Sequence, residues 1–180
     1  MENKSKDSNK KDIFVASIDI GTNSTHLLIA QIDKDLKSFT IKFTEKSTTR
    51  LGERDEDGNL TEVSINRVLE TLKRFKEYCF SYGVERILAA ATSAVREASN
   101  GKDLLTKVRD EVGFQIELIS GAEEARLIYL GVLSGMDLDN RSHIIVDIGG
   151  GSTELILANS EDTRALTSAR IGAVRLKNDF

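Results

Sequence analysis

Two short glycine-bearing segments match one another, and this match constrains the fold more than any other feature of the sequence. Residues 19–25 read DIGTNST, and residues 147–153 read DIGGGST. Each segment follows an apolar run and precedes another, so each predicts a tight turn between two strands, with an aspartate at the end of the first strand. Two such units predict two lobes that begin in the same way.

The two turns allow two interpretations. They can serve only as hairpin connections, or glycine can let successive backbone N–H groups point into one concavity, where Ser and Thr hydroxyls add donors for an oxyanion. The repeated pattern favours a phosphate held between the turns. It is neither a Walker loop nor a dinucleotide fingerprint, because no Gly-Lys-Ser/Thr and no helix follows. The predicted phosphate-binding residues are Gly21, Thr22, Asn23, Ser24, Gly149, Gly150, Gly151, Ser152 and Thr153.

Hydrophobic periodicity predicts a complete α/β lobe in the first part of the chain, with helices packed on a mixed five-stranded sheet. The acidic, glycine-bearing stretch 51–59 is expected to be a loop. We expect the strand at 86–91 to be buried and Cys79 to lie on the apolar face of the first helix. The predicted strands are 13–20, 25–32, 39–46, 86–91 and 115–119, and the predicted helices are 61–82, a short one holding Arg96, 102–112 and 122–133.

The pattern of three strands and a helix then starts again. Strands are predicted at 143–147, 153–158 and 164–170, and a helix from residue 172. We therefore expect a polar, flexible tail at 1–12, a first lobe at 13–138 and the incomplete start of a second lobe at 139–180. Half a lobe cannot bury its sheet well, so apolar surface is expected to be exposed at Leu155, Ile156, Leu166 and Ile171.

Composition excludes some classes of partner. The formal net charge of -4 gives no overall basic field for a nucleic-acid duplex. The chain has one cysteine and therefore no internal disulfide, which suits a reducing compartment. No apolar run is long enough for a membrane span or a signal peptide. The sequence thus predicts a cytoplasmic protein without membrane contact.

The motifs also carry a resemblance to a known family. The two glycine segments resemble the phosphate loops of the superfamily of acetate and sugar kinases, heat-shock ATPases and actin. Within it, the segments IDIGTNSTHLLIA, AAATSAVREA, ELISGAEEARLIYLGV, IVDIGGGSTELIL and IGAVRL are similar to the Ppx/GppA family. That family comprises exopolyphosphatases and guanosine pentaphosphate phosphohydrolases. The resemblance implies an actin-like (ribonuclease H-like) fold and a phosphoanhydride hydrolase.

Two adjacent glutamates are candidates for the base that activates water. Ser120 and Glu123 have the spacing of a capping box, in which Glu123 reaches back to the N–H of Ser120. Glu124 lies about a hundred degrees further round the helix and is left free to face the cleft. The helix N-terminus would lower its pKa, and burial would raise it. The resemblance also assigns the catalytic role to Glu124.

The resemblance implies further site residues. It makes Asp147 and Glu154 acids needed for catalysis and for Mg²⁺, a cation that prefers carboxylate oxygens. Asp19 is the counterpart of Asp147 and a further candidate ligand, whereas His26 stands at the position that matches Glu154.

Three arginines and an asparagine complete the candidates. The resemblance places Arg96 at the active site, where its forked cation can grip a terminal phosphate; a solvent-exposed helix arginine is the alternative. Asn23 matches an asparagine of the first phosphate loop. The role of Arg175 is left open, and Arg54 departs from the glycine that relatives often carry after RLGE.

Three functions remain open at this point. The first is hydrolysis of inorganic polyphosphate, with guanosine pentaphosphate as the alternative substrate and Mg²⁺ as the cofactor. The second is a kinase of the same superfamily. The third is a fragment that binds phosphate without turnover, because we expect 180 residues to be too few for the whole enzyme. Oligomeric state is also open, with a homodimer of the full-length protein as one option.

Overall fold

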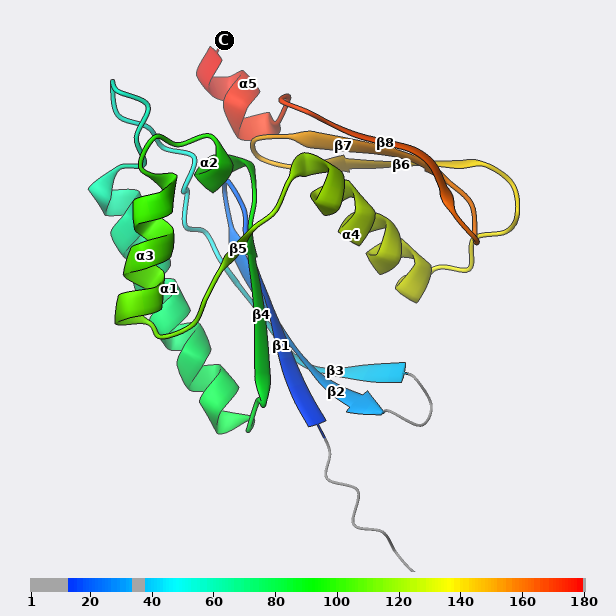
Figure 1. Cartoon of the computed structure of the whole chain (residues 1–180), viewed down its shortest axis with the longest axis horizontal. Helices are drawn as coiled ribbons and strands as arrows, with labels where there is room; N and C mark the ends of the chain where they lie inside the picture. Colours follow the sequence, from blue (N-terminus) through cyan, green and yellow to red (C-terminus); the bar gives the residue numbers. More distant parts are fainter. Residues whose placement is uncertain (1–12, 34–37, 180) are drawn as a thin grey trace, which may run out of the picture.

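The structure is a computed structural model that describes residues 13–33 and 38–179. The tail predicted at 1–12 lies outside the described residues. The rest of the chain forms two layered parts, one built on a five-stranded sheet and one on a three-stranded sheet, and helix α4 (Gly121–Gly135) follows the first sheet and packs on the second (Figure 1). Within the described ranges, no helix combines the length and hydrophobicity needed to cross a bilayer.

The first sheet has the strand order β3-β2-β1-β4-β5. Its first three strands form an antiparallel meander, and β4 and β5 add parallel to the β1 side. The predicted mixed five-stranded sheet is therefore confirmed, although its last strand is shorter than 115–119. The strands are β1 (Ile13–Ile20), β2 (Thr25–Asp33), β3 (Ser38–Ser47), β4 (Arg86–Ala91) and β5 (Glu117–Leu118).

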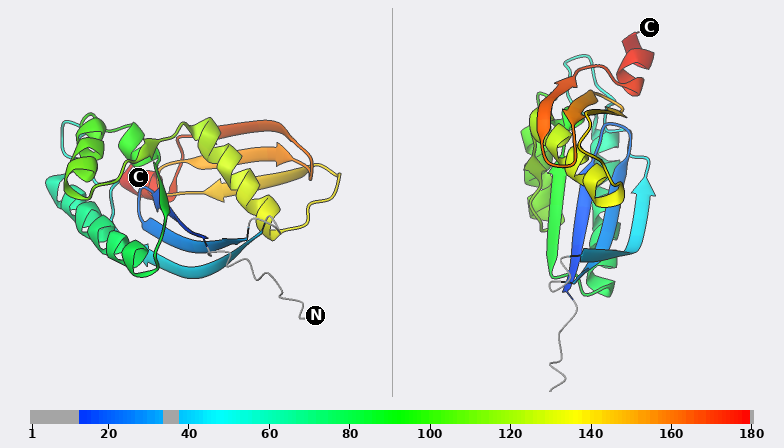
Figure 2. Two further views of the ribbon diagram at one scale, coloured as in Figure 1. Left: turned by 60° about the horizontal axis from the view of Figure 1, so that its bottom comes forward. Right: turned by 90° about the vertical axis from the view of Figure 1, so that its right-hand side faces the viewer.

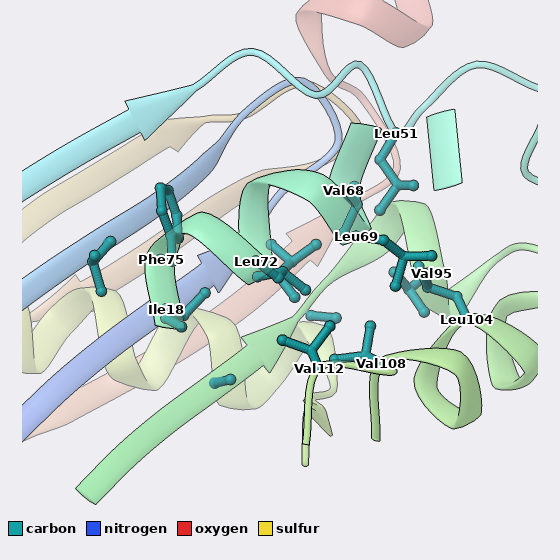
Figure 3. Close-up of a cluster of buried hydrophobic side chains, with 14 of the residues drawn as sticks. Ile18, Leu51, Val68, Leu69, Leu72, Phe75, Val95, Leu104, Val108 and Val112 are labelled. Carbon is teal, nitrogen blue, oxygen red and sulfur yellow. The ribbon is translucent and has the colours of Figure 1, made fainter. Parts of the chain in front are cut away.

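Helices α1 (Glu62–Ser81) and α3 (Gly101–Glu111) cover one face of this sheet (Figure 1). The side chain of Thr61 caps α1 by accepting a hydrogen bond from the N–H of Ser64 at 3.2 Å. The core between helices and sheet contains fully buried Phe75 and the predicted core residue Cys79, which is 3% exposed. Figure 3 shows side chains of both helices meeting those of the sheet.

The opposite face of the first sheet is open at β4, so the prediction of a fully buried strand is wrong. Ala89 and Ala91 point toward the helices and are buried, whereas Leu88 is 49% exposed. Side chains alternate between the faces of a strand, and among the described residues α1 and α3 cover only one face. The open face forms a wall of the cavity described below.

The second sheet is antiparallel, in the order β6-β7-β8. Helix α4 lies along one face of it (Figure 2, left), and Tyr129 of α4 packs with Ile156 and Ala158 of the sheet. The predicted three-strand meander and following helix are confirmed to within two residues. The elements are β6 (His143–Ile148), β7 (Thr153–Ala158), β8 (Thr163–Ala169) and α5 (Ala173–Asp179).

Two of the four apolar residues that were predicted to be exposed are exposed. Leu155 is 42% exposed and Ile171 is 54% exposed, as predicted. Ile156 is only 1% exposed, and Leu166 packs partly buried against the α4 cluster, so the prediction is wrong for these two. The reason is that they point from β7 and β8 toward α4, whereas Leu155 points to the uncovered face.

Candidate active site

The two glycine turns have the same local structure. In the first, the N–H of Gly21 donates to the carbonyl of Ser24 at 3.0 Å; in the second, the N–H of Gly149 donates to the carbonyl of Ser152 at 2.9 Å. The flanking strands pair in the same register, with Asp19 opposite His26 and Asp147 opposite Glu154. The predicted duplication of this unit is therefore confirmed, including the match between His26 and Glu154.

The turns lie against one another. A Cβ added at Gly150 would lie 3.1 Å from Cβ of Thr22, and one added at Gly151 would lie 2.4 Å from Oγ of Ser93. Only glycine permits this approach without a shift of the neighbouring atoms. The turns thus face each other, but they touch at Gly150 and Thr22 instead of standing apart across a gap.

A cavity of about 810 Å³ opens beside this contact, between the open face of the first sheet and helix α4. Its walls include Asp19 and Asp147, which immediately precede the two turns, together with Thr92 and Glu124. The predicted phosphate-binding residues of the turns are not among its lining residues within the described chain. The remaining lining residues are Ser17, Ile18, Ile87, Leu88, Ala89, Ala90, Gln115, Ile116, Glu117, Ile119, Glu123, Leu127 and Ile128.

Glu124 has the most perturbed carboxyl group of this cavity. Burial is the largest cause of a pKa raised to about 7, and the negative charges of Glu154 and Asp19 act in the same direction. Arg96 and a hydrogen bond with Thr92 oppose the shift. Its Oε2 atom is buried without a hydrogen-bond partner in the described part of the chain. Of the two effects considered from the sequence, burial therefore raises the pKa of Glu124.

The neighbouring Glu123 differs in its surroundings. Ser120 caps α4 as predicted, because its Oγ accepts a hydrogen bond from the N–H of Glu123 at 3.1 Å. The other half of the capping box is wrong: the Glu123 carboxylate binds the guanidinium of Arg126 through two hydrogen bonds of 2.8 and 2.7 Å. An arginine three residues along the same helix provides a charged partner that outcompetes a backbone amide.

Arg96 lies beside Glu124, at the end of the short helix α2 (Ser93–Arg96). Its Nη1 donates to the carbonyl of Ile119 at 2.7 Å and lies 3.6 Å from Oε2 of Glu124. The side chain is 26% exposed, so the alternative of a fully solvated helix arginine is wrong. One edge of the guanidinium is thus fixed by a backbone carbonyl close to the candidate base.

Of the three predicted metal ligands, two line the cavity and the third is buried. Asp19 and Asp147 line the same cavity, and the pKa of Asp19 is raised by burial and further by the charge of Asp147, against the effect of His26. Glu154 is 1% exposed and accepts a hydrogen bond from Ser168 at 2.7 Å. In the described residues, no group of three or more His, Cys, Asp or Glu side chains forms a metal cluster. The pair Asp19 and Asp147 fits Mg²⁺, which is commonly held by one or two carboxylates, waters and substrate phosphates. That Glu154 is a further ligand stays a prediction.

No role was predicted for Thr92, and that of Arg175 was left open. Thr92 follows β4, which pairs parallel with β1, so it lies at the same sheet edge as the first glycine turn. Ligands bind at this edge of parallel sheets, so the strand order was the sequence feature that could have pointed to Thr92.

Arg175 binds the carbonyl of Gly151 at 3.0 Å and Glu97 at 2.6 Å. Asn23 is exposed, and its carbonyl accepts from the N–H of Arg50 at 2.9 Å.

Known proteins resemble this chain over most of its length. A profile of the Ppx/GppA phosphatase family matches residues 28–180. The bifunctional 3-dehydroquinate synthase/phosphatase of Fusobacterium nucleatum is 40% identical over 182 residues, which cover 97% of this chain and 27% of that protein. The guanosine-5'-triphosphate,3'-diphosphate pyrophosphatase of Photobacterium profundum is 35% identical over 159 residues, 88% of this chain and 32% of that protein.

A solved structure agrees with the sequence matches. The crystal structure of an exopolyphosphatase from Cytophaga hutchinsonii superposes with a TM-score of 0.88 at 37% identity, covering 93% of this chain and 53% of that one. The predicted α/β, actin-like fold class is confirmed. The chain spans about half or less of the length of each of these relatives.

Proposed function

Because this chain belongs to the Ppx/GppA phosphatase family, we propose that it carries the catalytic groups of an exopolyphosphatase, which releases orthophosphate from the ends of inorganic polyphosphate. One observation carries the proposal. The carboxyl group of Glu124 lies in the cavity, 3.6 Å from Arg96, with a pKa raised to about 7. A general base works best when its pKa is near the working pH, and this glutamate meets that condition.

Glu124 takes the proton of the attacking water. Oε2 of Glu124 is buried and accepts no hydrogen bond in the described part of the chain, so its acceptor position is left for a water that is admitted beside it when substrate binds. The guanidinium of Arg96, which lies 3.6 Å from the same oxygen, offsets the negative charge on the phosphoryl oxygens. Glu154 contributes without touching the substrate, because its buried charge raises the pKa of Glu124.

Asp19 and Asp147 would hold Mg²⁺. When bound, the cation neutralises charge on the phosphate oxygens and orients them. The residues themselves support this assignment, because two carboxylates from the two sheets share one cavity, where burial and then the charge of Asp147 raise the pKa of Asp19. Their positions at the ends of β1 and β6 are fixed by strand pairing on both sides of the site.

The glycine turns are the proposed phosphate grip. The amides of Gly21 and Gly149 are used within the turns, so the donors available to a phosphoryl group are the N–H groups that follow them. The contact between Gly150 and Thr22 has to open for both turns to reach one phosphate. In this proposal the phosphate lies at the junction of the two sheets, next to Asp19 and Asp147.

Guanosine pentaphosphate is the alternative substrate, and one feature of the cavity favours it. Besides its acidic residues, the cavity exposes apolar side chains, among them Leu88, Leu127 and Ile128. Such a wall suits the flat face of a nucleobase, which polyphosphate lacks. The relative from Photobacterium profundum that carries the guanosine name matches 88% of this chain.

Orthophosphate release tests the proposal. Polyphosphate and guanosine pentaphosphate would each be offered with and without Mg²⁺ to this chain and to a version extended to the length of its relatives. Glu124→Gln is expected to abolish most release, whereas Glu123→Gln, the adjacent control, is expected to retain it. Undiminished release by Glu124→Gln would overturn the assignment. Turnover by the extended chain alone would make this segment a phosphate-binding part of the enzyme without turnover of its own.

A further inference from the structure

A second cavity lies on the other side of the contact between the glycine turns. It has a volume of about 360 Å³ and is formed by the loop after β3, helix α2 and helix α5. We call it the Arg54–Arg175 cavity, after the two arginines in its wall. Its lining residues are Thr22, Gly52, Arg54, Gly58, Ser93, Ala94, Glu97, Val174 and Arg175.

The two cavities differ in charge. The lining of the larger one contains the five carboxylates of Asp19, Glu117, Glu123, Glu124 and Asp147 and neither lysine nor arginine. The Arg54–Arg175 cavity is lined by two arginines and a single carboxylate, that of Glu97. That carboxylate is already neutralised, because Arg175 binds it at 2.6 Å and Arg170 lies 3.8 Å from it. The smaller cavity therefore has an excess of positive charge.

Arg54 supplies most of that excess. Its guanidinium donates to the carbonyls of Leu51, at 3.0 Å, and Ala94. Within residues 13–33 and 38–179, no ion pair joins it to a carboxylate. Burial lowers the pKa of the Arg54 guanidinium, and Arg175 adds to this effect, whereas Glu97 and Asp55 oppose it. A half-buried guanidinium held only by carbonyl dipoles is incompletely compensated and attracts an anion.

Hydroxyl groups complete the lining. Oγ1 of Thr22 and Oγ of Ser93 lie 2.9 Å apart and form a buried hydrogen bond. One hydroxyl donates to the other, and the second hydrogen is left to point elsewhere. Thr22 was predicted as a phosphate ligand, and its side chain lines this cavity instead of the larger one.

We propose that the Arg54–Arg175 cavity is a second anion site, which holds a phosphate group between the two sheets. Planar guanidinium groups match phosphate oxygens with paired hydrogen bonds. Arg54 belongs to the first sheet's loop and Arg175 to the helix after the second sheet, so a bound phosphate also ties the two parts together. Orthophosphate and a distal phosphate of a longer chain share this chemistry. The site does not depend on the hydrolytic assignment of Glu124.

Titration with orthophosphate tests the site directly. The chain would be titrated at constant ionic strength without divalent cations, following backbone amide resonances. Saturable shifts are expected at Gly52, Ala94 and Val174. Arg54→Gln should weaken binding about tenfold or more, since it removes a charge-assisted donor. Arg141→Gln is the matched control, because Arg141 is 84% exposed and pairs with Asp139; it should bind as the wild type does.

The same titrations have outcomes that would contradict the proposed site. Equal affinity in wild type and Arg54→Gln, or shifts confined to Thr92 and Glu124, would overturn it. If Arg54→Gln does not fold, Arg54→Lys replaces it: this variant keeps the charge but loses the fork, so weaker binding than wild type is expected and unchanged binding contradicts the site.

Tripolyphosphate separates the two sources of phosphate. A site for free orthophosphate binds both ligands with similar affinity, whereas a site for a distal group of the substrate binds tripolyphosphate more tightly. In either case Arg54→Gln must weaken binding, and a variant that weakens neither ligand refutes the site. Glu124→Gln should leave orthophosphate binding here intact, so loss of hydrolysis and loss of this site are separate results.

Discussion

Replacing Glu124 by glutamine is expected to make the protein more stable while it removes activity. The pKa of the Glu124 carboxyl rises from its ordinary value of 4.5 to about 7, chiefly because the group is buried. A shift of this size corresponds to roughly 3 kcal/mol. The side chain is 17% exposed, and solvent screening reduces the cost to about 2 kcal/mol. Glutamine has nearly the same shape and no charge to desolvate.

The sign of the effect depends on pH. Below about pH 4.5 the carboxyl is protonated in both the folded and the unfolded protein, so it costs nothing. As the pH rises toward 7, the unfolded chain ionises first, and the folded state loses stability relative to it. The advantage of Glu124→Gln should therefore be near zero at pH 4.5 and about 2 kcal/mol at pH 8, or roughly 4–8 °C in melting temperature for a domain of this size.

Thermal and urea unfolding of wild type and Glu124→Gln at both pH values measures this difference. Glu123→Gln is the control, for which the pH dependence of the change in stability is expected to have the opposite sign. The ion pair with Arg126 lowers the pKa of Glu123, so this carboxylate stabilises the fold above its ordinary pKa and loses that contribution on acidification. The reasoning is refuted if Glu124→Gln shifts the melting temperature equally at both pH values, or if it is the less stable protein at pH 8.

Three further predictions follow from contacts elsewhere. Gly172→Ala places a Cβ 2.4 Å from the carbonyl oxygen of Gly150, so we expect a destabilised second turn, seen as a lower melting temperature and lower orthophosphate release. Arg96→Gln removes a charge that lowers the pKa of Glu124, so the acidic limb of the rate profile should move to higher pH, and an unmoved limb would contradict the pairing. Phe75→Ala empties a fully buried position and should cost about 3–5 kcal/mol in urea unfolding; a cost below about 1 kcal/mol would mean that the core collapses around it.

The local units of the fold could be predicted from the sequence because each depends on neighbouring residues. The two Asp-Ile-Gly segments specify the same turn, and the structure gives them the same hydrogen bond and the same strand register. The cap at Ser120 was predictable for the same reason, since it needs only one side chain and the first turn of a helix. The choice of Glu124 over its neighbour rested on the other half of the capping box, which is wrong, because the Glu123 carboxylate binds Arg126 instead.

Distances between distant segments could not be predicted in this way. The contact of Gly150 with Thr22 depends on how closely the two sheets approach, which no spacing in the sequence encodes. The open face of β4 was missed because its run of alanines and leucine is apolar on both sides, and only the packing shows which side has a partner. The burial of Glu154 could not be predicted either, because it follows from the packing of β7 beneath α4.

The charged side chains around the glycine turns affect how a polyanion can bind. The larger cavity is lined by five carboxyl groups, and Arg96 lies beside one of them, so we expect a polyanion to enter more readily when a further cation accompanies it, because like charges in a partly desolvated space repel. Asp19 and Asp147, at the end nearest the turns, are the pair best placed to hold that cation. The arginines on the far side of the turn contact need no metal to receive a phosphate. The Arg54–Arg175 cavity, in contrast, has an excess of positive charge of its own. Because Thr22 contacts Gly150 and also lines this cavity, we expect an opening of the glycine turns to change the cavity as well.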